Sequence, residues 1–134
     1  MELGEAVIVA GIGSRKGVSA AEVIAAVETA LKEHGLTRPG LALLATARMK
    51  QGEAGIIAAG GTLNVPLILV DDDVLKEMSL RTLSHSEASL SAAGTPSVSE
   101  AAALAAAGEG ARLAGPRIAV GPVTCAIAFG GGEP

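Results

Sequence analysis

Aromatic side chains are almost absent from this chain. Phe129 is the only one among 134 residues, and acidic residues outnumber Lys and Arg by 14 to 10 for a formal net charge of -4. Proteins that bind single-stranded nucleic acids stack bases on aromatic rings, and nucleic-acid-binding proteins usually carry a basic excess. The composition therefore argues against a nucleic-acid partner and predicts an aliphatic core of Ala, Leu, Val and Ile.

Cysteine, metal-binding patterns and long apolar runs are also scarce. Cys125 is the only cysteine, which excludes an intrachain disulfide, and its apolar neighbours predict a buried thiol. No His/Cys cluster has metal-ligand spacing, so we expect neither a metal nor a cofactor. No apolar run approaches the ~20 residues of a membrane-spanning helix, and no basic-then-apolar leader opens the sequence. We expect a cytoplasmic protein without a membrane partner.

Strand and helix patterns alternate along the chain. Continuous β-branched or apolar runs predict strands at residues 6–12, 41–46 and 67–70, with one or two more within 113–129. Helical spacing predicts helices at 19–34 and 53–61, a short helix ending near Met78, and a helix starting near Ser97 and ending near Ala107. Ser19 with Glu22, and Ser97 with Glu100, have the spacing of a capping box at the start of the first and the last of these helices. This order predicts an α/β layered fold with a mostly parallel sheet flanked by helices.

The end of the chain departs from the alternation of strands and helices. The last strand is expected to run antiparallel at an edge or to pair with its predecessor as a hairpin. Residues 130–134 are expected to form a disordered tail. No linker is long enough to divide the sequence, so residues 1–134 are predicted to form a single domain.

The most informative motif is GIGSRKG, which lies between the first predicted strand and the first predicted helix. Glycines let backbone amides approach a ligand, and a helix N-terminus adds positive partial charge. Arg15 and Lys16 add full charges, so phosphate or carboxylate fits this turn. The order of residues matches neither GxxxxGK[ST] nor GxGxxG, which disfavours nucleotide binding. A tight strand-to-helix connection with solvated cations is the structural alternative.

Two further groups are expected at the same edge of the sheet, because ligands of open parallel sheets bind beyond the carboxyl ends of the strands. Arg48 and Lys50 follow the second predicted strand, and Gly94-Thr95-Pro96-Ser97 precedes the helix that ends near Ala107. Together with the first turn they supply two helix N-termini and four cations, which suits a ligand with several carboxylates. The alternatives are surface charge for the cations and a simple Pro-and-hydroxyl helix start for the second motif. The candidate ligand-binding residues are Gly11, Gly13, Ser14, Arg15, Lys16, Gly17, Arg48, Lys50, Gly94, Thr95, Pro96 and Ser97.

Candidates for catalysis are few. His85 lies between hydroxyls in Ser84-His85-Ser86, which permits a hydrolase hypothesis with His85 as the base and Ser14 as the nucleophile or water-orienting group. An ordinary loop histidine is the structural alternative. The acidic run that begins at Asp71 can cap the helix that follows it.

The segments GIGSRKGVSAAEV and GTPSVSEAAALAAAG resemble the CobE family of cobalamin biosynthesis and the C-terminal domain of the related CbiG proteins. The resemblance runs from about Val7 to about Phe129. It implies a role in building the corrin ring of vitamin B12, as a carrier or auxiliary factor that binds a corrin-ring intermediate such as a precorrin or hydrogenobyrinic acid. The family often has Cys where this chain has Ser14.

The same resemblance leaves two alternatives. CbiG-type proteins are similar to a hydrolase that opens a lactone on a cobalt-precorrin and releases a two-carbon fragment. A non-catalytic module that docks other enzymes of the cobalamin pathway is the second alternative.

Overall fold

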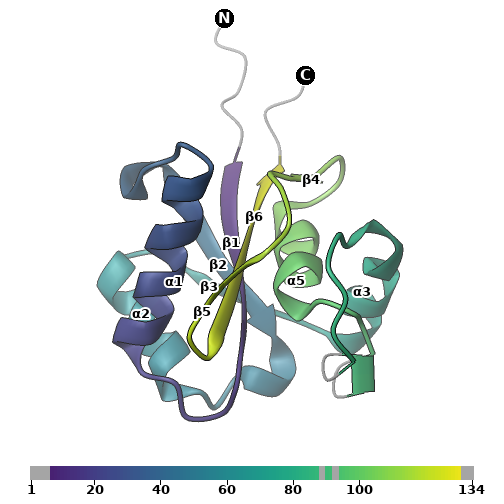
Figure 1. The fold of residues 1–134 in the computed structure, drawn as a ribbon, viewed down its shortest axis with the longest axis horizontal. Coiled ribbons are helices and arrows are strands. Elements are labelled where there is room, and N and C mark those ends of the chain that lie inside the picture. The colour runs from purple at the N-terminus through teal and green to yellow at the C-terminus, as the bar shows by residue number, and fades with distance from the viewer. Residues whose placement is uncertain (1–6, 88–89, 92–93, 131–134) are drawn as a thin grey trace, which may run out of the picture.

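The computed structural model describes residues 7–87, 90–91 and 94–130, which form a mixed sheet between two helical layers (Figure 1). Within the described residues the strand order is β3-β2-β1-β6-β4, and β5 also pairs with β6. The strands are β1 (Val7–Ser14), β2 (Leu41–Ala47), β3 (Leu67–Val70), β4 (Arg112–Leu113), β5 (Ile118–Val120) and β6 (Val123–Gly130). β1, β2 and β3 are parallel, whereas β6 is antiparallel to β1 and to both short strands. The predicted α/β layered fold is confirmed, and the last strand is antiparallel and forms the predicted hairpin with its predecessor β5, although it lies inside the sheet and not at an edge.

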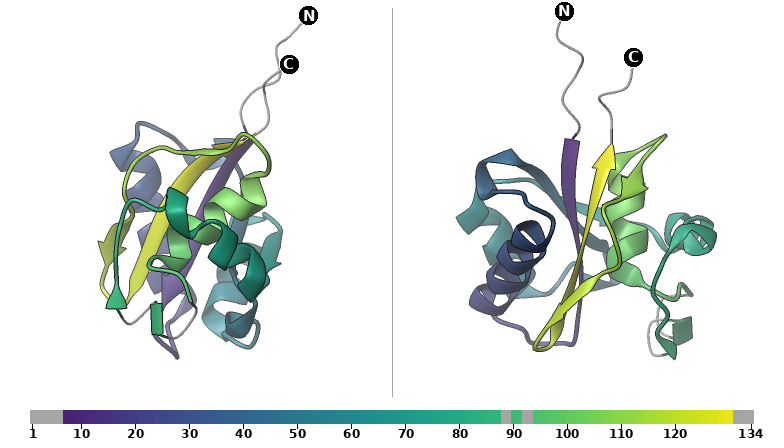
Figure 2. Two further views of the ribbon diagram at one scale, coloured as in Figure 1. Left: turned by 90° about the vertical axis from the view of Figure 1, so that its right-hand side faces the viewer. Right: turned by 45° about the horizontal axis from the view of Figure 1, so that its top comes forward.

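Helices cover both faces of this sheet. Two of them, α1 (Ala20–Glu33) and α2 (Ala54–Leu63), lie on one face, and α5 (Val98–Ala107) and the short α3 (Asp72–Glu77) lie on the other (Figure 2). Single 3-10 turns are formed by Arg38–Gly40, Arg48–Lys50 and Ser79–Arg81. None of the helices in these described ranges has the length and hydrophobicity that a membrane span requires.

The start of α1 follows from its sequence. The Ser19 hydroxyl accepts a hydrogen bond from the Glu22 amide at 3.1 Å, and the Glu22 carboxylate accepts one from the Ser19 amide at 2.9 Å. This capping box satisfies two amides that a helix N-terminus otherwise leaves free. The helix then buries Val23, Val27 and Leu31, which recur at helical spacing and face the sheet. The predicted capping box and helix are confirmed.

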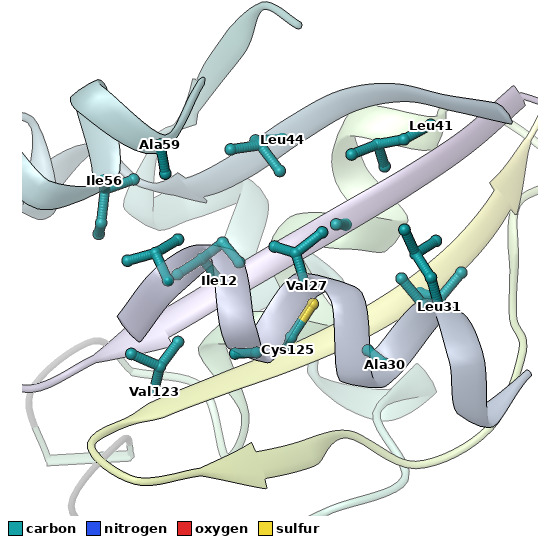
Figure 3. Close-up of a cluster of buried hydrophobic side chains, with 14 of the residues drawn as sticks. Ile12, Val27, Ala30, Leu31, Leu41, Leu44, Ile56, Ala59, Val123 and Cys125 are labelled. Atoms are coloured by element: carbon teal, nitrogen blue, oxygen red, sulfur yellow. The ribbon is translucent and has the colours of Figure 1, made fainter. Parts of the chain in front are cut away.

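The two cores differ in the size of their side chains. Between the sheet and the α1/α2 layer, branched residues such as Ile12, Val27 and Leu44 pack together, and Cys125 projects from β6 into the same cluster (Figure 3). On the other face, α5 contributes mainly alanines to the core. Small side chains allow α5 to approach the backbone of the sheet closely.

Gly11 shows how close that approach is. A Cβ atom on Gly11 would lie 2.0 Å from the Ser99 carbonyl oxygen and 2.7 Å from the Ala103 nitrogen. Such distances are below van der Waals contact, so only glycine fits at this point of β1. Gly11 therefore has a packing role between β1 and α5, whatever the ligand.

The end of the chain requires a correction. Gly130, which the sequence analysis places in a disordered tail, is instead the buried last residue of β6 and pairs with Val7. A Cβ atom there would lie 2.1 Å from the Ala107 carbonyl oxygen, so glycine is needed where β6 passes the end of α5. The remaining predicted tail, 131–134, lies outside the described residues.

Candidate functional site

The carboxyl edge of the parallel strands carries the three predicted groups. The turn after β1 holds Arg15 to Gly17, and the 3-10 turn Arg48–Lys50 follows β2 directly. The start of α5 reaches the same edge, because a Cβ atom on Gly13 would lie 3.6 Å from the Ser99 nitrogen. This edge faces downward in Figure 1. The topology therefore places Arg15 to Gly17, the Arg48–Lys50 turn and the start of α5 at one end of the sheet, whereas Gly11 lies within β1 against α5.

The two faces of β1 separate these candidates. Side chains alternate along a strand, and Gly11 and Gly13 face α5 while Ile12 packs into the α1/α2 core. Ser14 therefore lies on the α1/α2 side of β1, opposite to the start of α5. A single ligand can therefore contact residues from both faces of β1 only beyond the end of the strand.

The glycine turn is less open than the sequence predicts. The Arg15 amide donates to the Pro122 carbonyl oxygen at 3.2 Å, and the Gly17 amide donates to the Glu53 carboxylate at 2.9 Å. Gly17 has a φ of 78°, a backbone conformation that favours glycine, and a Cβ atom there would meet nothing within 4 Å. Two of the turn amides thus already have internal acceptors.

The basic side chains of this turn have no carboxylate partner among the described residues. Arg15 and Lys16 are exposed, and neither forms an ion pair with any residue in the described part of the chain. Adjacent cations repel each other slightly, and a carboxylate or phosphate between them removes that repulsion. The side chains of the turn are therefore better placed to hold an anion than its amides.

The second basic group is partly neutralised. The Arg48 guanidinium forms an ion pair with the Asp71 carboxylate, which extends from the end of the neighbouring β3. Asp71 occupies the N-cap position of α3, but its side chain makes no capping hydrogen bond. The acidic run is placed as predicted, with Asp71 at the N-cap and Asp72 and Asp73 in the first turn of α3, but the Asp71 carboxylate pairs with Arg48 and does not bond to the helix amides. Lys50 has no ion pair within the described ranges.

The two hydroxyl residues of the motif before α5 are buried, whereas Gly94 and Pro96 are partly exposed. Thr95 and Ser97 are 0 % exposed, and the Ser97 hydroxyl accepts hydrogen bonds from the Glu100 amide at 3.4 Å and from Arg117 Nη1 at 3.3 Å. Gly94, with a φ of 76°, provides the turn into this segment. In this structure the hydroxyls are enclosed rather than presented at the surface.

Glu100 also belongs to this region, although it is not among the residues that the sequence predicts. The spacing of Ser97 and Glu100 predicts a capping box, but only the Ser97 half forms. The Glu100 carboxylate instead accepts hydrogen bonds from the Ser84 hydroxyl and amide at 2.7 and 2.8 Å, the Leu83 amide at 2.7 Å and the Arg117 amide at 2.9 Å. These donors come from segments far from α5 in the sequence, so no local signal identifies them.

The protonation state of Glu100 follows from the same contacts. The residue is 0 % exposed, and desolvation by burial by itself raises its pKa. The hydrogen bonds from Ser84, Arg117 and Leu83 favour the charged form and together outweigh burial, so the pKa is below the ordinary value. The buried, charged carboxylate therefore links the first turn of α5 to two other segments by hydrogen bonds, one at Leu83 and Ser84 and one at Arg117.

The two candidate catalytic residues are not hydrogen-bonded to each other. The exposed His85 bonds through Nε2 to the Glu87 carboxylate at 2.8 Å. The Ser14 hydroxyl is buried and has no hydrogen-bond partner among the described residues. A hydroxyl without a neighbouring base is a poor nucleophile, so the assignment of Ser14 and His85 to catalysis gains no support from this geometry and stays a prediction.

Comparison with known proteins identifies the family. The sequence model described as "Cobalamin synthesis G C-terminus" matches residues 8–128. A curated relative, "Protein CobE" from Sinorhizobium sp, is 33% identical over 121 residues, which are 90% of this chain and 79% of the relative.

Solved structures agree with this assignment. The crystal structure of CobE, a protein from the cobalamin (vitamin B12) biosynthetic pathway, aligns with a TM-score of 0.89 and 35% identity over 92% of this chain and 90% of that one. The cobalamin biosynthesis protein ChiG from Agrobacterium tumefaciens aligns with a TM-score of 0.75 and 49% identity over 92% of this chain and 98% of that one. The chain therefore belongs to the family of the cobalamin synthesis G C-terminus and is a cobalamin biosynthesis protein of the CobE and CbiG C-terminal type.

Proposed function

We propose that this protein binds a corrin-ring intermediate of cobalamin biosynthesis through the acidic side arms of the ring, as a carrier or auxiliary factor. The observation that supports this most directly is the pair Arg15 and Lys16. Both are exposed at the carboxyl edge of the sheet without a carboxylate partner in the described part of the chain. In a chain with a net charge of -4, two adjacent unpaired cations form a local site for an anion.

The chemistry of the ligand fits this edge. Corrin precursors are large flat macrocycles fringed with acetate and propionate arms. Arg15 and Lys16 can hold such arms by charge-assisted hydrogen bonds. Lys50, at the end of the neighbouring strand, provides a third cation, and Met49 beside it is 52% exposed. A flexible thioether side chain suits contact with the face of a ring, and with Phe129 as the only aromatic residue little stacking contributes.

The test is binding of hydrogenobyrinic acid to the purified protein. We expect the pigment to elute with the protein on gel filtration and its visible spectrum to change. The double variant Arg15→Ala plus Lys16→Ala should weaken binding by about 1–3 kcal/mol, which is roughly 5- to 150-fold, because charge-assisted hydrogen bonds are lost.

A control at a distant site is Arg38→Ala, which removes one positive charge where the double variant removes two. Arg38 precedes β2 at the opposite edge of the sheet and is ion-paired with Glu28 at 3.0 Å, so its loss removes a positive charge without touching the proposed site. Affinity should stay unchanged in this variant. Free elution of hydrogenobyrinic acid and of every precorrin tried would reject the proposed function, and an unaffected double variant would place the acidic arms elsewhere on the protein.

A further inference from the structure

The contact between Glu53 and Gly17 suggests how the proposed site is occupied before its ligand arrives. We infer that the Glu53 carboxylate fills the position at the glycine turn that a carboxylate of the ligand takes, so that binding displaces Glu53. This inference rests on the proposed function. It adds that Glu53 competes with the ligand for the same site.

The carboxylate of Glu53 bonds to a distant turn and does not cap its own helix. Glu53 is the N-cap residue of α2, but its side chain makes no capping hydrogen bond to its own helix. Oε1 instead accepts the amide hydrogen of Gly17, 36 residues earlier in the chain, at 2.9 Å. The turn therefore demonstrably accommodates a carboxylate, and that carboxylate belongs to the protein.

Close packing explains why Glu53 reaches the turn. The first turn of α2 lies directly against the chain before α1, because a Cβ atom on Gly55 would lie 2.1 Å from the Val18 carbonyl oxygen. This contact places the residue that precedes α2 beside Gly17. The Glu53 side chain is only partly buried, so it can leave the turn without unpacking the core.

The balance of contacts favours exchange. Within the described ranges, the Glu53 carboxylate takes a hydrogen bond from the Gly17 amide and forms no ion pair with Arg15 or Lys16. A ligand carboxylate at the same amide gains that hydrogen bond and the two adjacent cations as well. The displaced Glu53 side chain then lies at the N-terminus of α2, where a negative charge is favourable.

The variant Glu53→Gln tests this competition. It removes the competing charge and keeps a side-chain oxygen for the Gly17 amide. We expect hydrogenobyrinic acid to bind the variant about two- to fivefold more tightly than the wild-type chain, the size expected for one exposed charge contact. Affinity is measured by absorbance titration at low ionic strength, and thermal unfolding of the variant verifies that it is folded.

Glu28→Gln is the matched control. It changes the net charge by the same amount, but Glu28 pairs with Arg38 at the opposite edge of the sheet. Its affinity should equal that of the wild type. An equal gain in both variants would assign the effect to overall charge and overturn the inference.

A second measurement does not depend on any variant. In the wild-type protein, the 13C shift of the Glu53 carboxyl group should move toward the value of a solvated glutamate as hydrogenobyrinic acid is added. An unchanged shift in a protein that binds the pigment, or weaker binding by Glu53→Gln, would overturn the inference and leave the proposed function intact. Failure of the wild-type protein to bind any corrinoid would overturn both.

Discussion

The carboxylate of Glu100 is fully buried and accepts hydrogen bonds from three residues of two other segments. We predict that Glu100→Gln lowers the free energy of unfolding at neutral pH by about 1–3 kcal/mol, because an amide NH2 group would face donors where an acceptor is needed. The measurement is urea unfolding of both proteins. Equal stabilities would mean that these hydrogen bonds contribute nothing net.

The pH dependence of stability has a definite sign at this residue. The pKa of Glu100 is below its ordinary value of 4.5 because its hydrogen bonds outweigh desolvation by burial. The contribution of the charged form is therefore present above the pKa in the unfolded chain and is lost as pH falls through the pKa in the folded state. The wild-type protein should lose stability more steeply below pH 4.5 than Glu100→Gln does. Parallel acid titrations of the two proteins would contradict this assignment.

Among the elements, α5 and β1 pack with the least space for an added side-chain atom. The helix approaches the strand so closely that a Cβ atom on Gly11 would lie 2.0 Å from a backbone oxygen of α5. We predict that Gly11→Ala destabilises the protein by about 1–3 kcal/mol or more, because neither backbone can move away without opening the core. Thermal unfolding measures the loss, and Gly52→Ala, where a Cβ atom meets nothing within 4 Å, is the control. Equal losses in the two variants would contradict the close-packing argument.

At the scale of the whole molecule, the two helical layers close the sheet on both faces and enclose the only thiol. Cys125 is 0 % exposed in the core between β6 and α1, and desolvation by burial raises the pKa of its thiol above the ordinary value. We predict that an aromatic disulfide reagent does not react with Cys125 in the native protein and reacts fully in denaturant. Because only the opened molecule exposes the thiol, the rate of labelling at intermediate denaturant should follow global unfolding. Rapid labelling of the native protein would contradict a closed core.

Local patterns in the sequence predict most elements but not their contacts. The capping box of Ser19 and Glu22 forms as predicted, because both partners lie within one helical turn. The same spacing at Ser97 and Glu100 forms only half of the box, since donors at Ser84 and Arg117 compete for the carboxylate. Identical local patterns thus differ in outcome because their surroundings differ.

At the candidate site, too, the sequence predicts where residues lie but not which partners they contact. The sequence places Arg15, Lys16 and Arg48 after strands, and parallel strands bring them to one edge of the sheet. Only the structure shows that Arg48 is paired with Asp71 while Arg15 and Lys16 have no partner in the described part of the chain. It also shows the Gly17 amide bonded to Glu53. Both partners come from other elements, and spacing along the chain carries no information about them.

The sequence alone determined the alternation of strands and helices, the helix starts and the family, because periodicity, capping chemistry and motif order are properties of neighbouring residues. The tertiary structure decided that β6 lies between β1 and the short strands β4 and β5, and that Gly130 ends this strand. It also decided which carboxylates meet Gly17, Arg48 and Ser84. Hydrogen bonds and ion pairs act over a few ångströms of space, so partners far apart in the sequence are selected only when the whole chain packs.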